Sequence, residues 1–295
     1  MPAAVTRLRA IGVHPVGLPF RGIRYLDPGH RADAFFRGGY GLGVRRTALH
    51  AALTQRAAQL AIPVVQTRVT GFTQHADRVA AAGIEARYLV AADGLHSSIR
   101  RACALDAPPA RRPRFGLRRH YRMAPWSDLV EVYWSPGAEA YVTPVADQLV
   151  GVAVLGGSRG DFDSRLAAFP ALRERLAAAE PAGGVRGAGP LRQDVRCRVR
   201  ANVLLVGDAS GYIDALTGEG ISVALAQAAV LVECLQSGSA AGYEHAWRQV
   251  SRKSRLLTAG LLWSRHRSLL APHIVPAAEH FPRLFTSIVN HVAAA

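Results

Sequence analysis

Asn202-Val-Leu-Leu-Val-Gly-Asp208-Ala-Ser-Gly-Tyr-Ile-Asp-Ala-Leu-Thr217-Gly-Glu-Gly220-Ile-Ser-Val-Ala-Leu-Ala-Gln227 is the stretch that decides the fold. Its first residues, Val203 to Val206, form an apolar run of the kind found in a strand that is buried on both faces. Gly207 then allows a sharp turn, and Asp208 stands where such a strand ends. This order predicts a carboxylate at the carboxyl end of a parallel strand.

A second glycine turn, Thr217 to Gly220, leads into a helical run that we expect from Ile221 to about Gln236. Free N–H groups at the start of a helix attract phosphate or another anionic oxygen. A carboxylate such as Asp208 accepts hydrogen bonds from sugar or polyol hydroxyls. Both features suit a nucleotide cofactor with a polyol arm. A plain turn or capping role is the alternative for each residue.

Two further segments carry similar features. The first is Arg87-Tyr-Leu-Val-Ala-Ala-Asp93-Gly94-Leu-His-Ser97-Ser-Ile-Arg100, with an acidic residue and a glycine after an apolar run. The second is Gly41-Leu-Gly43-Val-Arg-Arg46-Thr-Ala-Leu49-His-Ala-Ala-Leu53, in which Arg46 precedes two leucines at helical spacing. Asp93-Gly94 is also a common turn pair, and Arg45 competes with Arg46 for any role.

Together the three segments resemble FAD-dependent monooxygenases of the para-hydroxybenzoate hydroxylase fold. The variant Asp-Ala-Leu-Thr-Gly-Glu-Gly is most similar to the geranylgeranyl reductase branch of that family. The resemblance implies an α/β (mixed α+β) fold, in which an FAD/NAD(P)-binding domain carries an inserted antiparallel β-sheet substrate domain. It also implies FAD as cofactor and these cofactor-binding residues: Arg46, Asp93, Gly94, Ser97, Arg100, Gly207, Asp208, Thr217, Gly218, Glu219 and Gly220.

One departure from the family concerns its opening unit, a strand, a Gly-x-Gly-x-x-Gly turn and a helix that hold the ADP half of FAD. Gly39-Tyr-Gly41-Leu-Gly43 has a different spacing. We therefore expect an N-terminally truncated version of the fold, with Met1-Pro2 at an internal position of the family pattern. A fragment, a start assigned too late and a degenerate copy all stay open. We expect FAD binding by these residues alone to be weak.

The resemblance and the apolar pattern together predict three regions. The FAD-binding domain is expected at residues 41–106 and 198–240, the β-sheet substrate domain at 10–40 and 107–197, and a helical region at 241–295. Strand candidates in the sheet domain are Leu129 to Trp134, Ala140 to Thr143 and Leu149 to Leu155. In the family this sheet roofs the substrate, so Tyr133, Trp134 and Tyr141 are candidate substrate-wall residues, with ordinary core packing as the alternative.

Composition sets the remaining limits. The net charge is +15, but Lys253 is the only lysine and the arginines are scattered without a nucleic-acid-binding motif, so we expect no nucleic-acid partner. The three cysteines have no Cys-x-x-Cys pair, and no apolar run is long enough to span a bilayer, so we expect a cytoplasmic protein. His266, His273 and His280 recur every seven residues, but prolines interrupt them, and we expect no metal site.

A hydrolase is a competing hypothesis, because Gly156-Gly-Ser158-Arg-Gly160 matches the Gly-x-Ser-x-Gly nucleophile motif. That motif needs a helix directly after the serine, and Asp161-Phe-Asp163 intervenes before helical periodicity resumes. The sequence therefore favours a flavin enzyme over a serine hydrolase.

The predicted function is FAD-dependent oxidation or reduction of a hydrophobic small molecule, with NAD(P)H as a transient reductant. We favour a monooxygenase; a C=C reductase of the geranylgeranyl type and a non-catalytic remnant that binds no flavin are the alternatives. Because the flavin performs the chemistry, no side chain is assigned as catalytic acid or base. Family members with hydrophobic substrates often work at membrane surfaces, so the resemblance leaves peripheral membrane contact open.

Overall fold

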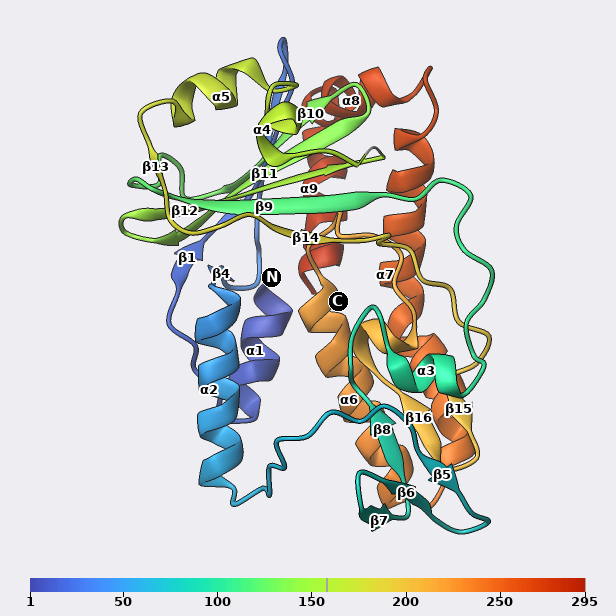
Figure 1. Cartoon of the computed structure of the whole chain (residues 1–295). Helices are drawn as coiled ribbons and strands as arrows, with labels where there is room; N and C mark the ends of the chain where they lie inside the picture. Colours follow the sequence, from blue (N-terminus) through green and yellow to red (C-terminus); the bar gives the residue numbers. More distant parts are fainter. Residues whose placement is uncertain (158, 295) are drawn as a thin grey trace.

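The large sheet is the centre of the computed structural model, which describes residues 1–157 and 159–294 (Figure 1). Ser158, the nucleophile of the hydrolase hypothesis, lies outside the described residues. The sheet has eight strands in the order β13-β9-β12-β11-β10-β2-β3, with β14 paired to β9. Their bounds are β2 Gly22–Leu26, β3 Arg31–Phe35, β9 Phe115–Arg122, β10 Val130–Ser135, β11 Ala138–Ala146, β12 Leu149–Gly156, β13 Glu180–Pro181 and β14 Arg186–Ala188.

Apolar residues cover both faces of this sheet because side chains alternate along each strand. On one face, Val150 and Val152 pack with Phe162 of α4 (Phe162–Leu166) and Leu172 of α5 (Pro170–Leu176). On the other, Val132 packs with residues of α7 (Tyr243–Arg265), of α8 (Ile274–His280) and of the loop before α6 (Gly220–Gln236). Helix α9 (Pro282–Ala293) packs on the same sheet at β3. The confirmed strand predictions in this region follow from that clear alternation.

A second, smaller layer lies below the sheet in Figure 1. Strand β16 (Val203–Leu205) pairs parallel with β8 (Leu89–Ala91) and antiparallel with β15 (Val199–Arg200). All three residues of β16 are buried, as the apolar run predicted. Helix α6 (Gly220–Gln236) packs on this layer together with α7, and α1 (Pro2–Ala10) packs against α6. Helix α3 (Ser98–Ala102) follows β8.

The remaining elements are short. Strands β1 (Leu18–Phe20) and β4 (Gly41–Gly43) form an antiparallel pair, after which α2 (Arg46–Gln59) begins. Strands β5 (Thr73–Gln74), β6 (Val79–Ala81) and β7 (Ile84–Ala86) form a separate meander. No helix within the described part of the chain is long and apolar enough to cross a membrane.

Some elements that the sequence predicts differ in the structure. Val64-Val65 and Val69 to Phe72 predict strands, but the structure has no strand in the described residues 61–72, where Val64 and Val65 are largely exposed. Leu191 to Arg200 predicts one strand, but residues 191–198 are mostly irregular and only Val199–Arg200 form β15. The segment after His266 is divided near its prolines, as the sequence predicts: α8 ends at His280 and α9 begins at Pro282. Pro276 lies in the first turn of α8, where a helix needs no proline N–H.

Candidate cofactor and substrate site

Asp208 lies at the carboxyl end of β16, in a short 3₁₀ turn over Gly207–Ser210. Its carboxylate is partly buried and forms no hydrogen bond or ion pair with a protein group in residues 1–157 or 159–294. Burial raises its pKa above the ordinary value, and the positive charge of Arg46 opposes that shift. A partly buried carboxylate without a protein donor is costly unless a ligand supplies one.

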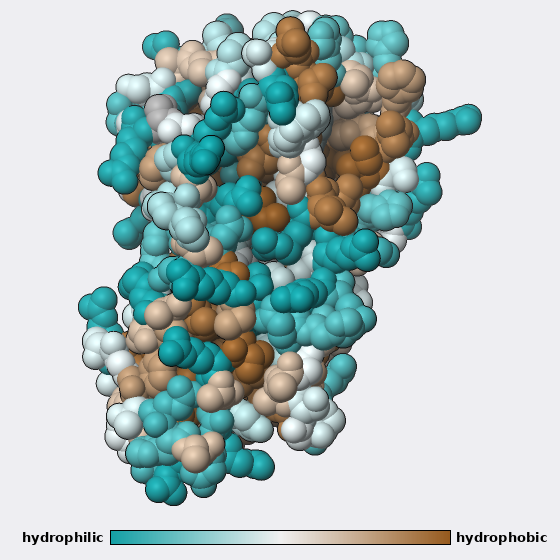
Figure 2. Space-filling model, turned by 90° about the vertical axis from the view of Figure 1, so that its right-hand side faces the viewer, coloured by the Kyte–Doolittle hydropathy of each residue, from teal (hydrophilic) through white to brown (hydrophobic). Residues whose placement is uncertain are grey.

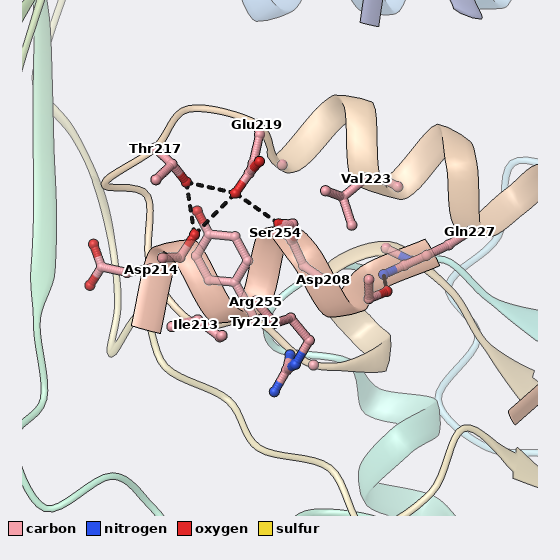
Figure 3. A pocket seen from close by; sticks show the side chains of 16 residues that line it. Asp208, Tyr212, Ile213, Asp214, Thr217, Glu219, Val223, Gln227, Ser254 and Arg255 are labelled. Carbon is pink, nitrogen blue, oxygen red and sulfur yellow. Dashed lines mark hydrogen bonds between the residues drawn. The ribbon is translucent and has the colours of Figure 1, made fainter. Parts of the chain in front are cut away.

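Glu219 and Asp208 both line a small cavity of about 50 Å³ (Figure 3). Oε1 of Glu219 accepts hydrogen bonds from the hydroxyls of Thr217 (2.9 Å), Ser254 (2.7 Å) and Thr258 (3.0 Å). Its Oε2 is buried and has no partner in the described part of the protein. The cavity has room for a few water molecules only. It is therefore too small to hold the cofactor, and Glu219 contributes a polar group to its lining.

The N-terminus of α6 lies directly after Glu219. The amides of Gly220 and Ile221 donate to no described protein group, as expected for the first turn of a helix. Gly218 has φ +67°, a left-handed conformation that favours glycine, and a Cβ there would meet nothing within 4 Å. The turn therefore offers free N–H donors beside open space.

Arg46 joins this turn across a second cavity of about 300 Å³. Arg46 lies at the first position of α2, and the same cavity is lined by Gly218 and Ile221 at the start of α6. The structure thus brings together residues that are more than 170 positions apart in the sequence. Carboxylate, guanidinium and helix N-terminal amides are suitable groups for the polyol, phosphate and ring oxygens of FAD.

A third cavity, of about 670 Å³, is mostly apolar and shares Gly218 with the second. Its walls come from the sheet, for example Ile23, Val132 and Tyr141, and from the C-terminal helices, for example Leu261 and Phe285. Its size suits a hydrophobic small molecule. Because Gly218 lines both spaces, a ligand at the start of α6 would adjoin a ligand in the apolar cavity.

Of the three predicted substrate-wall residues, only Tyr141 lines this cavity, and its hydroxyl donates to the Leu216 carbonyl at 2.9 Å. Trp134 is buried next to the cavity lining; its ring contacts Tyr25 edge-on, and the Arg265 guanidinium lies over its face. Tyr133 packs with the α4–α5 side of the sheet, and its hydroxyl donates to Glu131. The structure does not place Tyr133 in the wall of this cavity, because adjacent residues of one strand point to opposite faces.

The segment from Asp93 to Arg100 has a connecting role. Asp93 accepts hydrogen bonds from the Ser98 and Ile99 amides, while Ser97 caps α3 by accepting from the Arg100 amide. Burial acts to raise the pKa of Asp93, but hydrogen bonds from its neighbours outweigh it and lower that pKa. None of Asp93, Gly94, Ser97 and Arg100 lines any of the three cavities.

Arg100 links this segment to the turn that holds Asp208. Its side chain is 1% exposed and donates to Asp106 (2.6 Å) and to the carbonyl of Ala209 (3.2 Å). In the structure Arg100 therefore positions the residue next to Asp208, and a cofactor contact for the segment stays a prediction.

A buried ionic network fixes the other side of the site. Arg114 donates to Glu139 (2.6 Å) and to Asp214 (2.9 Å), and Arg265 of α7 pairs with the same Glu139. Burial acts to lower the pKa of Arg114, but the two carboxylates outweigh it and raise that pKa. The network ties the sheet, the end of α7 and the loop that leads to Gly218 into one unit.

Sequence reasoning missed the groups on α7 that face Glu219 and Gln227. Ser251, Ser254 and Thr258 are buried and recur at three- and four-residue spacing, which places them on one face of the helix. Polar residues that recur with this spacing on one face of a helix were the sequence signal that could have identified them. The Arg114–Glu139–Arg265 network had no such signal, because its members are far apart in the sequence.

Sequence comparison identifies distant relatives of this chain. No family model matches the chain. Digeranylgeranylglycerophospholipid reductase from Methanococcus vannielii is 25% identical over 267 residues, which cover 81% of this chain and 68% of the reductase. Protein CbrA from Escherichia coli O9:H4 is 27% identical over 255 residues, covering 75% of this chain and 61% of that protein. The chain spans about two thirds of the length of these curated relatives.

Solved structures establish the fold. The flavin-dependent brominase Bmp2 superposes with a TM-score of 0.84 at 15% identity, over 100% of this chain and 83% of the brominase. Klebsiella pneumoniae HpxO, solved with FAD and uric acid, gives a TM-score of 0.71 at 17% identity, over 100% of this chain and 86% of HpxO. The predicted mixed α/β fold is confirmed, and the predicted N-terminal truncation stays a prediction.

Proposed function

We propose that this protein binds FAD at the start of α6 and oxidises or reduces a hydrophobic small molecule held in the apolar cavity. One observation carries the proposal. The unpartnered carboxylate of Asp208, the free amides of Gly220 and Ile221 and the wall of the apolar cavity all meet around the 217–220 turn. Two adjacent ligands, one polar and one apolar, fit this arrangement.

Some residues of the site would bind the cofactor, and others would exclude water from the substrate. Asp208 would accept hydrogen bonds from the polyol arm, and the α6 amides would donate to an anionic oxygen of the cofactor. Arg46 would hold a phosphate. The sheet and the C-terminal helices would keep water from the substrate. The bound flavin supplies hydride transfer or, with O₂, oxygen transfer, and NAD(P)H is proposed as its reductant.

Monooxygenase chemistry is our first proposal, and C=C reduction is the second. The second is favoured by the Thr217-Gly-Glu-Gly220 variant and by the 25% identity to a protein named as a digeranylgeranylglycerophospholipid reductase. Oxygen uptake distinguishes the two. We expect substrate-dependent consumption of O₂ with NAD(P)H for a monooxygenase, whereas a reductase would convert substrate under anaerobic conditions. A protein with no affinity for FAD would instead be a non-catalytic relative.

Exposed apolar side chains at the mouth of the large cavity support peripheral membrane contact. Leu256, Phe281, Leu284 and Ile288 line the cavity and are also 62%, 62%, 59% and 43% exposed. Figure 2 shows a hollowed apolar patch in the upper half of the molecule, the half that holds the large sheet. Co-sedimentation with anionic vesicles, compared between wild type and a Phe281→Ser/Leu284→Ser variant, tests this route for a hydrophobic substrate. Equal binding of both proteins would contradict it.

A further inference from the structure

Four arginines and one histidine, from the start of α2 and from strands β9 and β14 of the large sheet, lie close enough to act on one another electrostatically. Arg45 and Arg46 lie at the beginning of α2, and Arg118 and His120 lie two residues apart on β9, hence on one face of that strand. Arg186 on β14 is the direct antiparallel partner of Arg118. We call these five residues the arginine cluster.

The positive charges of the cluster are not neutralised by the protein. Within the described residues, none of its four arginines forms an ion pair with an acidic group. Arg119, the next residue of β9, points to the other face and pairs with Asp163 at 2.8 Å. Like charges directly opposite each other on paired strands are destabilising, so the unpaired Arg118–Arg186 contact is unusual for a purely structural feature.

The electrostatics show that the members of the cluster act on one another. Burial lowers the pKa of Arg118, and the charges of Arg46, Arg186 and Arg45 lower it further. Burial also lowers the pKa of His120, with Arg118 and Arg45 adding to the effect. The region therefore combines a concentrated positive potential with guanidinium groups that bind phosphate oxygens in a bidentate way.

We propose that the cluster residues other than Arg46, namely Arg45, Arg118, His120 and Arg186, bind the diphosphate of a nucleotide, and that this nucleotide is the NAD(P)H reductant; Arg46 is the neighbouring residue that faces the proposed flavin site. The assignment of the reductant rests on the proposed function. Both FAD and NAD(P)H carry a diphosphate. All four arginines are exposed, but Arg46 lines the cavity at the start of α6, whereas Arg45, Arg118 and Arg186 line none of the three cavities described above. An exposed site suits a ligand that binds and leaves in each cycle. Arg46 acts on Asp208 as well, so the cluster adjoins the proposed flavin site.

The test is an Arg118→Ala/Arg186→Ala double variant, which leaves Arg46 and the proposed flavin site intact. An Arg101→Ala/Arg196→Ala variant is the matched control, because it removes the same charge from exposed arginines that have no ion pair in the described structure. Titration with NADPH should give a dissociation constant about tenfold or more higher for the cluster variant, and a value within twofold of wild type for the control. FAD affinity should stay within twofold of wild type in both.

Inorganic pyrophosphate separates this inference from the proposed function, because its binding needs neither flavin nor turnover. Wild type that binds pyrophosphate, and a cluster variant that does not, support the site even if FAD fails to bind. Unchanged NADPH and pyrophosphate affinity in the cluster variant would overturn the inference, as would an equal loss in the control. A loss confined to FAD would show that the cluster serves the flavin, and would also overturn it.

An Arg118→Lys/Arg186→Lys variant keeps the charge but not the bidentate geometry, and should recover only part of the affinity. Circular dichroism and thermal melting of each variant establish that the fold is retained.

Discussion

Replacing Asp208 should weaken flavin binding and at the same time stabilise the flavin-free protein. Asp208 is partly buried, and no protein group in the described residues donates a hydrogen bond to it. Burial raises its pKa, with Arg46 only partly opposing the shift. The ionised carboxylate is therefore a cost in the free protein and a benefit once a ligand donates to it, as is typical of functional residues.

The magnitude follows from the bond that is removed. A hydrogen bond to a charged group contributes about 1.5–3 kcal/mol, so Asp208→Ala should lower FAD affinity about tenfold or more. Asp208→Asn keeps a neutral acceptor, whose hydrogen bond is about half as strong, and should lose about half of that free energy. The ratio of the FAD dissociation constants of variant and wild type tests the role of Asp208 even where wild type binds FAD weakly.

The effect on stability has the opposite sign and depends on pH. Because the pKa of Asp208 is raised in the folded state, its ionised form destabilises the native protein at neutral pH. This penalty is lost as the pH falls through the folded-state pKa. Without FAD, Asp208→Asn should melt at a higher temperature than wild type at pH 7, and the difference should vanish below about pH 4.

Flavin fluorescence titration and thermal melts between about pH 3 and pH 8 measure both effects. A protein with unchanged FAD affinity after Asp208→Ala would refute the role of Asp208. An Asp208→Asn variant that is less stable than wild type at pH 7 without FAD would show that the carboxylate has a structural partner, contrary to the geometry.

Three further predictions concern the cavity wall and the buried polar groups. Tyr141→Ala should raise KM for the substrate with flavin absorbance unchanged. Tyr133→Ala, on the other face of the sheet, should leave KM within twofold. Steady-state kinetics that give equal increases in KM for the two variants would contradict the assignment of Tyr141 to the cavity wall. Glu139→Ala should lower the free energy of unfolding by about 3–5 kcal/mol, because it leaves two arginines buried without their shared carboxylate; urea denaturation measures this, and a loss under 1 kcal/mol would refute it. Glu219→Ala should cost at least about 2 kcal/mol by the same measurement, since three hydroxyls lose their acceptor, while Glu219→Gln, which keeps one carbonyl oxygen, should cost less.

The parts of the fold that were predictable are those whose pattern is local. The strands from Val130 to Gly156 alternate and are separated by turn signals, and α6 follows a glycine turn, so both were predicted within a few residues. Residues 61–72 are rich in β-branched residues, yet they form no strand, because no neighbouring strand pairs with them. Intrinsic preference was overridden there by tertiary context.

The site was predictable only where its residues follow one another in the sequence. Asp208 and the 217–220 turn were found because strand, turn and helix are contiguous. The hydroxyls that face Glu219 come from α7, and the arginine cluster joins α2, β9 and β14. Contacts between such distant segments depend on the tertiary arrangement, which no local pattern encodes. The structure also gave Arg100 a connecting role that its motif alone did not indicate.

Hydrogen–deuterium exchange with and without saturating FAD tests the central claim most directly, because it locates the flavin on this chain without requiring turnover. We predict that FAD slows exchange at the amides of residues 207–221 and at the start of α2 around Arg46, with little change in the α4–α5 segment behind the sheet. Protection that is absent at residues 207–221, or confined to other parts of the chain, would contradict the proposed flavin site.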